Sequence, residues 1–475
     1  MAGKRVDLEI KNITISEMTL EGKGIARHEG MVIFVEKCVP GDVVDINVFH
    51  RKKNYMEARP LVFHLYSPLR QTAHCKHFGV CGGCKLQHVQ YQAQLNFKHQ
   101  HVIDALQRLG KIEIGEVLPI LAAPTTQYYR NKLQFSFAAK RWFTEEEIQT
   151  TEKIIDSTGV GFHIPGRFDK VLDIDHCYHQ PDPSNDFRQA LKGFAREHQL
   201  EFFDTWFQKG FLRNLTIRNT TLGEWMLILQ FFENIPEKVQ LVMEFLKQRF
   251  PELTSLYYVI NAKGNDTFDD LEMQLYHGKP FITERMEDLY FRIGPKSFFQ
   301  TNAHQAVELY RITRDFAGLT GQEIVYDLYT GTGTIACFLA HQAKEVIGVE
   351  YIAAAIEDAK LNAQANGITN THFYAGDMSE VLLDKSRLAQ HPAPDVIITD
   401  PPRTGMHPLV VDSLLTTDCP RIVYVSCNPA TQARDLAQLS AKYDVKKVQP
   451  VDMFPHTAHI ENVALLELKT EFKRA

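Results

Sequence analysis

Three residues with reactive side chains stand at the ends of apolar runs in the last third of the sequence. Asp400 ends "DVIITD", Cys427 ends "RIVYVSC", and Glu461 opens the alternating run that follows "FPHTAH". Parallel sheets place ligand-handling groups at the carboxyl ends of their strands, which predicts that Asp400 and Cys427 share one edge. A thiolate can attack a substrate covalently, and a carboxylate can remove a proton. These three residues are the first candidates for a catalytic site.

Noncatalytic roles must also be considered for the cysteines and for Glu461. Cys337 and Cys419 stand in ordinary helix or turn contexts, where a thiol acts as a small buried hydrophobe. Cys427 taken alone could be a redox sensor, a metal ligand or a buried side chain, and Glu461 could face solvent. The strand-end position of Cys427 favours the catalytic interpretation.

A glycine-rich turn follows the apolar run "EIVYDLY". Gly331 and Gly333 would let the backbone approach a ligand closely, with helix N–H groups directed at it. Glu350 ends the next apolar run, at the spacing of an acid that binds a ribose diol. The turn alone would also suit NAD, because Ala336 at the third glycine position is tolerated.

The combination of "DLYTGTG", the acid at Glu350 and "DPPR" resembles an S-adenosylmethionine-dependent methyltransferase domain. The resemblance covers about residues 290–475 and implies that Glu350 holds the ribose. It also implies that Gln300 and Tyr329 line the methionine and ribose region. Acids that end the third and fourth strands join the glycines in the predicted cofactor-binding set, which is Gln300, Tyr329, Gly331, Gly333, Glu350, Asp377 and Asp400.

A thiol next to a methyl donor has a chemical use when the methyl acceptor is carbon. Addition of a thiolate to C6 of uracil turns the ring into an enolate, whose C5 can attack the methyl group. A base must then remove the C5 proton before the thiol leaves, and Glu461 is the candidate. Amine methylation is disfavoured, since Arg403 replaces the aromatic residue that closes the related loop of adenine-amino methyltransferases.

A second cysteine group precedes the central part of the chain. Cys75, Cys81 and Cys84 form C-x5-C-x2-C, and Cys177 in "DIDHCYHQ" is a possible fourth ligand. Four thiolates commonly hold zinc, and they also hold iron-sulfur clusters. Spacing alone leaves the two metals open.

The motifs "FFQTN", "DLYTGTG", "DPPRTG", "VSCNPAT" and "FPHTAHIE", in this order, resemble the RNA uracil-5-methyltransferases, close to their 23S ribosomal RNA enzymes. The resemblance implies that Cys427 is the nucleophile, Glu461 the general base and Asp400 a contact to the uracil edge. It also implies a [4Fe-4S] cluster on Cys75, Cys81, Cys84 and Cys177, with zinc as the alternative. The expected substrate is a flipped uridine of 23S rRNA, with transfer RNA as the alternative. An iron-sulfur oxidoreductase and a noncatalytic RNA-binding or assembly protein are the rival functions.

The elements that must position these residues suggest three domains. Residues 1–62 read as short strands of an OB-like barrel that resembles a TRAM RNA-binding domain. Residues 63–285 are expected to form an α+β domain that carries the metal site, although its segment 91–119 could pack on the catalytic domain. In residues 286–475 strands alternate with helices, which predicts a Rossmann-like, doubly wound α/β domain.

Composition agrees with several buried cores. The chain has 475 residues, 44% of them hydrophobic and 23% charged, with a net charge of −6. We expect a cytoplasmic monomer with no membrane segment, because no apolar run is long enough and no signal peptide is apparent. RNA contacts must then come from local basic or aromatic stretches, such as "FHRKKN" and "YYRNKLQFSF" with Arg130.

Overall fold

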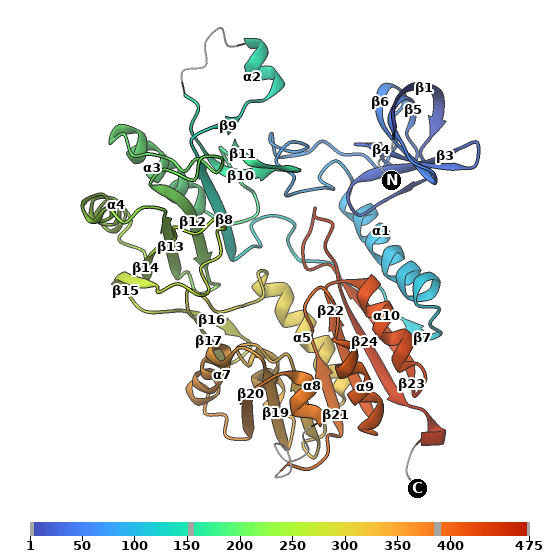
Figure 1. Ribbon diagram of the computed structural model, residues 1–475. Coiled ribbons are helices and arrows are strands. Elements are labelled where there is room, and N and C mark those ends of the chain that lie inside the picture. Colours follow the sequence, from blue (N-terminus) through green and yellow to red (C-terminus); the bar gives the residue numbers. More distant parts are fainter. Residues whose placement is uncertain (1–3, 151–155, 384–390, 473–475) are drawn as a thin grey trace.

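The computed structural model describes residues 4–150, 156–383 and 391–472 (Figure 1). The chain begins with a six-stranded barrel-like sheet in the order β1-β5-β6-β4-β3-β2. Alternating apolar residues of these strands point inward and form a separate small core. The strands are β1 (Lys4–Thr14), β2 (Glu17–Met18), β3 (Lys23–His28), β4 (Met31–Glu36), β5 (Val43–Arg51) and β6 (Tyr55–Leu65).

The central domain is an eight-stranded mixed sheet in the order β15-β14-β13-β12-β8-β10-β11-β9. Strands β12 and β13 form a hairpin across the turn at 220–223. Helices α3 and α4 pack over this sheet, whose aromatic-rich core is distinct from that of the barrel. The elements are β8 (Lys132–Ala138), β9 (Arg141–Trp142), α2 (Glu145–Thr150), β10 (Gly159–Ile164), β11 (Arg167–Asp173), α3 (Ser184–Glu197), β12 (Leu212–Asn219), β13 (Trp225–Phe231), α4 (Pro236–Arg249), β14 (Ser255–Ile260) and β15 (Gln274–Gly278).

The C-terminal domain contains the predicted α/β sheet. Five strands, β20, β19, β18, β21 and β22, run parallel, and β24 and β23 follow in antiparallel pairing. A hairpin, β16 (Ile282–Met286) and β17 (Leu289–Ile293), precedes them. The remaining elements are α5 (Ala303–Ala317), β18 (Ile324–Leu328), α6 (Thr334–Ala340), β19 (Glu345–Glu350), α7 (Ala353–Ala365), β20 (Thr371–Ala375), α8 (Met378–Leu383), β21 (Val396–Thr399), α9 (Pro408–Thr416), β22 (Arg421–Ser426), α10 (Pro429–Leu439), β23 (Tyr443–Val451), β24 (Glu461–Leu468) and the 3₁₀ turn η2 (Thr470–Phe472).

A segment from the first quarter of the chain completes this sheet. Helix α1 (Tyr91–Asp104) continues into the π-helical turn η1 (Ala105–Leu109) and packs along α10, as Figure 1 shows. Strand β7 (Ile114–Val117) then pairs in parallel with β23 as the eighth strand. The segment 91–117 therefore belongs spatially to the catalytic domain, although the barrel and the central domain flank it in sequence.

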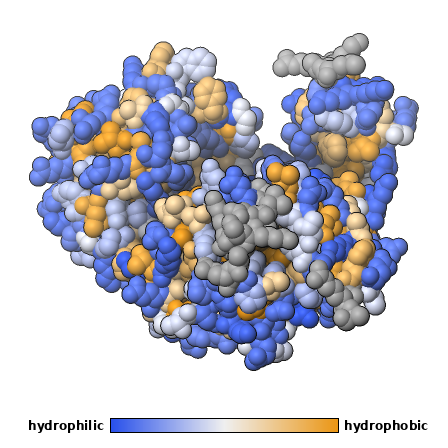
Figure 2. Space-filling view, turned by 60° about the horizontal axis from the view of Figure 1, so that its bottom comes forward, coloured by the Kyte–Doolittle hydropathy of each residue, from blue (hydrophilic) through white to orange (hydrophobic). Residues whose placement is uncertain are grey.

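The face of the molecule in Figure 2 is mostly polar, and the helices are too short or too polar to span a membrane in the part of the chain that the structure describes. Figure 2 shows a largely hydrophilic face on which the N-terminal barrel stands as a separate lobe.

A buried ion pair holds α1 on the catalytic domain. Nζ of Lys98 lies 2.6 Å from Oδ1 of Asp452, and both side chains are fully buried. The ammonium also donates to the carbonyl of Phe454 at 3.0 Å, and the hydroxyl of Tyr91 donates to Asp452 at 2.9 Å. Burial lowers the pKa of Lys98, while the charge of Asp452 raises it.

Substitution Lys98→Met should lower the free energy of unfolding of the catalytic domain by about 3–5 kcal/mol, because it leaves the Asp452 carboxylate buried without its cation. Urea unfolding would measure the change. Lys360→Met is the matched control, since Lys360 pairs with Glu357 on an exposed helix face and should cost less than about 1 kcal/mol. Equal losses in the two variants would contradict the prediction.

Candidate active site

Cys427 lies at the carboxyl end of β22, in the turn that leads into α10. Asn428 caps this helix, because its side chain accepts a hydrogen bond from the N–H of Ala430 at 3.1 Å, and Pro429 occupies the first turn. The strand therefore stops at the thiol, which is half-buried. The predicted strand-end position of Cys427 is what the structure shows.

The loop after β21 is fastened to this turn. The side-chain amide of Asn428 and the hydroxyl of Thr431 both donate to the carbonyl of Arg403, at 3.0 and 3.2 Å. Asp400 stands at the start of that loop, directly after β21. The structure thus brings the "DPPR" loop beside the thiol.

The pKa values of Asp400, Glu461 and Cys427 depend on one another at this sheet edge. Burial raises the pKa of Asp400 to about 7, and neighbouring Asp327 adds to the shift. Glu461, the first residue of β24, is only 4% exposed, and burial followed by the charge of Asp400 raises its pKa well above the usual range. Burial, then the charges of Glu461 and Asp400, raise the pKa of Cys427 to about 11, while Arg403 lowers it. These mutual effects place the three predicted residues in one electrostatic unit.

The glycine turn after β18 has the shape needed to receive a ligand. Tyr329, Gly331 and Gly333 all have positive φ, at 62°, 56° and 74°. A side chain at Gly333 would collide with Ala359, whereas a Cβ at Gly331 would meet no atom within 4 Å. Gly333 is therefore required for packing, and Gly331 borders open space.

Glu350 completes this turn from the end of β19. Its carboxylate accepts hydrogen bonds from the N–H groups of Gly331, at 3.1 Å, and Ile352, at 2.9 Å. The acid is thereby fixed at the turn, where a ribose diol could bind to it. The carboxylate of Glu350, which can accept hydrogen bonds from hydroxyl groups, and the space at Gly331 fit the ribose and methionine parts of S-adenosylmethionine.

The other predicted cofactor residues lie around the same turn. The hydroxyl of Thr332 donates to the carbonyl of Phe298 at 3.4 Å, which brings the segment containing Gln300 against the glycine turn. The side-chain amide of Asn131, from the central domain, donates to the carbonyl of Gln300 at 2.9 Å. Asp377 is exposed and follows β20, and its charge contributes to the raised pKa of Tyr329, after burial as the main cause.

The four cysteines of the second group line one cavity of about 290 Å³. Cys75, Cys81 and Cys84 come from the loop between β6 and α1, and Cys177 comes from the loop between β11 and α3. Burial raises the pKa of all four thiols, that of Cys81 to about 11 and that of Cys84 to about 12. The fold therefore gathers four thiols from two distant segments around one cavity.

Histidines surround these thiols and link them to the catalytic domain. Nε2 of His179 lies 3.1 Å from Sγ of Cys84, and the rings of His456 and His459 also line the cavity. His459 in turn contacts Arg403, with Nδ1 3.4 Å from Nη2. The cysteine cavity and the active-site loop are thus neighbours.

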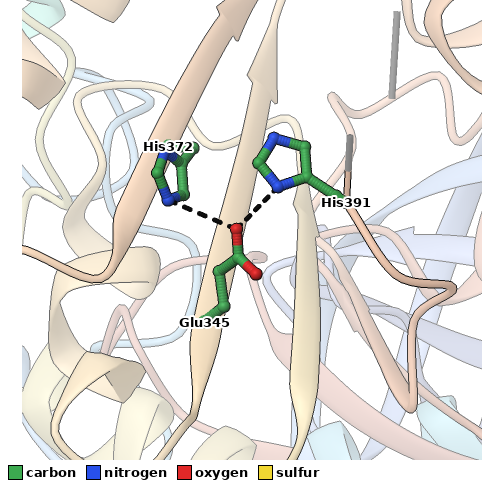
Figure 3. A group of neighbouring side chains, drawn as sticks. All are labelled: Glu345, His372 and His391. Carbon is green, nitrogen blue, oxygen red and sulfur yellow. Dashed lines mark hydrogen bonds and ion pairs between the residues drawn. The ribbon is translucent and has the colours of Figure 1, made fainter. Parts of the chain in front are cut away.

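A cluster of one glutamate and two histidines lies at the amino end of β19, at the opposite end of this strand from Glu350 (Figure 3). Among the described residues, only Glu345, His372 and His391 bring three metal-ligand atoms within 4.8 Å of one another. The carboxylate of Glu345 lies 2.6 Å from Nδ1 of His391 and 3.2 Å from Nε2 of His372, and Tyr374 contacts the other nitrogen of His391 at 2.6 Å. Because Glu345 begins β19 and Glu350 ends it, this network is remote from the cofactor turn and ties together two strands and the chain before β21.

Several residues of the site were not predicted from the sequence. Lys98 and Asp452 are 354 positions apart, and nothing in either local sequence indicates a pair. His176 and His179 both flank Cys177 in the sequence, and only the structure shows that His179 is the one beside Cys84. Asp327 could have been found, since it immediately precedes the glycine turn, and burial raises its pKa to about 7.

Comparison with known proteins decides the family. A family model described as tRNA (Uracil-5-)-methyltransferase matches residues 185–469, and a TRAM domain model matches residues 5–61. The chain belongs to the RNA uracil-5-methyltransferase family. Membership establishes S-adenosylmethionine-dependent methylation of uracil C5 in RNA and confirms the α/β methyltransferase fold with an N-terminal TRAM domain.

Relatives within this family cover nearly the whole chain. An RNA methyltransferase of Bacteroides thetaiotaomicron is 53% identical over 95% of this chain and 100% of its own. One of Porphyromonas gingivalis is 51% identical over 96% and 100%. The solved structure of Pyrococcus abyssi tRNA (uracil-54, C5)-methyltransferase with S-adenosyl-L-homocysteine superposes with a TM-score of 0.73, at 30% identity, over 95% of this chain and 99% of that one.

The electrostatic unit predicts how Cys427 reacts with an alkylating reagent as the pH is varied. Arg403→Leu should move the midpoint of Cys427 alkylation to higher pH, because it removes a positive charge that lowers the thiol pKa. Glu461→Gln should move it to lower pH, because it removes a negative charge that raises that pKa. Mass spectrometry of the Cys427 peptide would follow the reaction.

Glu467→Gln is the control for this titration, since Glu467 lies further along β24 and away from the thiol. Its midpoint should equal that of the wild type. Identical midpoints in all four proteins would show that Arg403 and Glu461 do not act on the thiol.

Proposed function

We propose that this enzyme methylates C5 of a specific uridine in 23S rRNA through a covalent adduct between Cys427 and C6. The observation that carries the proposal is the convergence of the thiol, Asp400 and Glu461 at one sheet edge beside the glycine turn. The choice of 23S rRNA rests on the resemblance of the cysteine spacing to ribosomal RNA enzymes. Transfer RNA is the second candidate, favoured by the similarity to the Pyrococcus abyssi enzyme.

Cys427 performs the first chemical step. Its thiol loses a proton to water, at a cost set by its raised pKa and reduced by Arg403, and the thiolate adds to C6 of the uracil. The electron pair of the C5–C6 double bond then forms an enolate with the C4 carbonyl. Asp400, at the edge of the same site, hydrogen-bonds the uracil and holds C5 in line for the transfer.

Glu461 performs the last chemical step. The turn at Gly331 and Glu350 would hold the ribose and methionine parts of S-adenosylmethionine, which would supply the electrophilic methyl group that C5 attacks. Glu461 accepts the proton that C5 still carries, the double bond re-forms, and the C6–S bond breaks to release the thiolate. Burial suits Glu461 to this role, because a raised pKa makes its carboxylate a stronger base than an exposed one.

The test uses RNA from a strain that lacks this enzyme, incubated with S-adenosylmethionine carrying a tritiated methyl group. Wild-type protein should place label on C5 of uridine in 23S rRNA, and Cys427→Ala should place none. Glu461→Gln should accumulate a protein–RNA adduct that survives denaturation, because the C5 proton is no longer removed. Denaturing gel electrophoresis and nuclease mapping of the labelled RNA would measure these outcomes.

Glu467→Gln again serves as the matched carboxylate control and should turn over without a stable adduct. Label in tRNA alone would replace the substrate and keep the mechanism. Unchanged labelling by Cys427→Ala would overturn the covalent mechanism.

We further propose that Cys75, Cys81, Cys84 and Cys177 hold a [4Fe-4S] cluster. The spacing of the thiols supports a cluster over a single zinc ion. All four thiols line one cavity, yet no three of these described cysteines bring their sulfur atoms within 4.8 Å of one another. Zn–S bonds of ~2.3 Å in a tetrahedron require sulfurs ~3.8 Å apart, whereas a cluster holds its ligands further apart.

Protein purified without oxygen should contain about four irons and four sulfides per chain. Cys177→Ala should lose most of the iron and the sulfide, because it removes one of the four thiolates and the one that comes from a separate segment. Cys419→Ala is the control, since Cys419 is a buried thiol of the catalytic domain and should leave the iron content unchanged. One zinc per chain and no sulfide would refute the assignment.

A further inference from the structure

Three large aromatic side chains stand exposed together on the central domain. Phe168, at the start of β11, is 62% exposed, and Trp206 and Phe207, in the loop before β12, are 66% and 59% exposed. We call these three residues the aromatic platform. Large aromatic residues usually bury most of their surface, and an exposed apolar cluster marks an interaction site.

The rings of the platform are arranged for stacking. The centroids of Phe168 and Trp206 are 6.0 Å apart, and their planes are inclined by only 21°. The ammonium groups of Lys140 and Lys209 lie 4.6 and 5.4 Å from the centroid of Phe207. Flat apolar faces therefore lie next to positive charges, which is the combination that single-stranded nucleic acid binds.

Hydrogen bonds to Asp204 order the loop that carries Trp206 and Phe207. The carboxylate of Asp204 accepts hydrogen bonds from the backbone N–H groups of both residues, at 3.0 and 3.1 Å. The N–H of Asp204 donates to the carbonyl of Lys209 at 2.8 Å, and Asp204 itself is 8% exposed. The exposure of the aromatic rings is thus a property of an ordered turn.

A series of contacts joins the platform to the active-site region. Arg403 contacts His459, and His459 and Phe162 both line the cysteine cavity. Phe162 lies on β10, whose hairpin partner β11 begins with Arg167 and Phe168. The β10–β11 hairpin therefore leads from the wall of the cysteine cavity to the platform.

We propose that the aromatic platform binds unpaired bases of the substrate RNA near the target uridine. This inference rests on the proposed function and names a surface for it. The bases stack on Trp206 and Phe168, while Lys209 contacts a phosphate. Lys140 and Arg167 stand nearby but pair with Asp204 and Asp169. A duplex would not fit, because its bases are already stacked on one another.

Steady-state methyl transfer to RNA from the deletion strain provides the first test. Trp206→Ala should raise the KM for RNA by roughly 5- to 150-fold, the range expected for losing one stacked base, with little change in kcat. Trp206→Phe should restore most of the loss, because it keeps an aromatic face. Tyr290→Ala is the matched control: Tyr290 is 46% exposed on β17, in the hairpin before the catalytic sheet, and its loss should leave KM unchanged.

Tryptophan fluorescence of the full-length wild-type protein provides a test that needs no turnover. The chain has three tryptophans, and Trp206 alone among these described residues is mostly exposed. A short single-stranded RNA should quench its emission, and the same strand annealed to its complement should quench it much less. Trp206→Phe should abolish the quenching.

Unchanged KM in Trp206→Ala, or equal quenching by the duplex, would overturn the proposal and leave the methyltransferase function intact. Wild-type protein that fails to methylate uracil C5 would instead overturn the proposed function, while the quenching would still report on the platform. Lost RNA affinity in Trp206→Phe as well as Trp206→Ala would point to misfolding of the loop, which circular dichroism and thermal unfolding would reveal.

Discussion

The buried contact between Lys98 and Asp452 is the constraint on which the active site depends. Asp452 begins the segment 452–460, which ends immediately before Glu461. The same segment receives hydrogen bonds from several other parts of the chain. Tyr129 donates to the carbonyl of Pro455, Lys85 and Leu86 donate to the carbonyl of His456, and the side chain of Asn302 donates to the carbonyl of Met453. The segment 452–460 is thus joined to helix α1, the cysteine loop, the central domain and the segment that contains Gln300. It thereby fixes the position of Glu461.

The electrostatics of the site follow from this enclosure. Removing carboxyl groups from water favours their neutral forms, and the groups near the thiol discourage one another from ionising. Glu461 and Asp400 therefore hold protons more strongly than exposed acids, and Cys427 holds its proton more strongly than a free thiol. Arg403 is the charge that opposes this trend, and it comes from the loop fastened to the Cys427 turn. Burial destabilises the charged forms of these acids, but it also makes the carboxylate that removes the C5 proton a stronger base.

Most of the catalytic domain could be predicted from its sequence, because local patterns specify it. Apolar runs that end in acids or cysteine identified the parallel strands, and positive-φ glycines mark the cofactor turn at Gly331 and Gly333. The antiparallel pairing of β24 with β22, and the addition of β7 to the sheet, could not be predicted, since each depends on partners far away in the chain. The same holds for His179 beside Cys84 and for Lys98 beside Asp452. A charged residue in a helix gives no local sign that it will be buried against a partner 354 positions away.

The addition of β7 to the catalytic sheet also affects the order in which the chain can be assembled. Its partner, β23, spans Tyr443–Val451 and is synthesised long after β7. Until β23 is made, β7 has no strand with which to pair, and the cavity of the four cysteines lacks His456 and His459 on its wall. The barrel and the central domain have cores of their own and can fold earlier during synthesis. A chain made only as far as the central domain therefore leaves the four cysteines without part of their cavity wall, and synthesis of the segment 452–460 completes that wall.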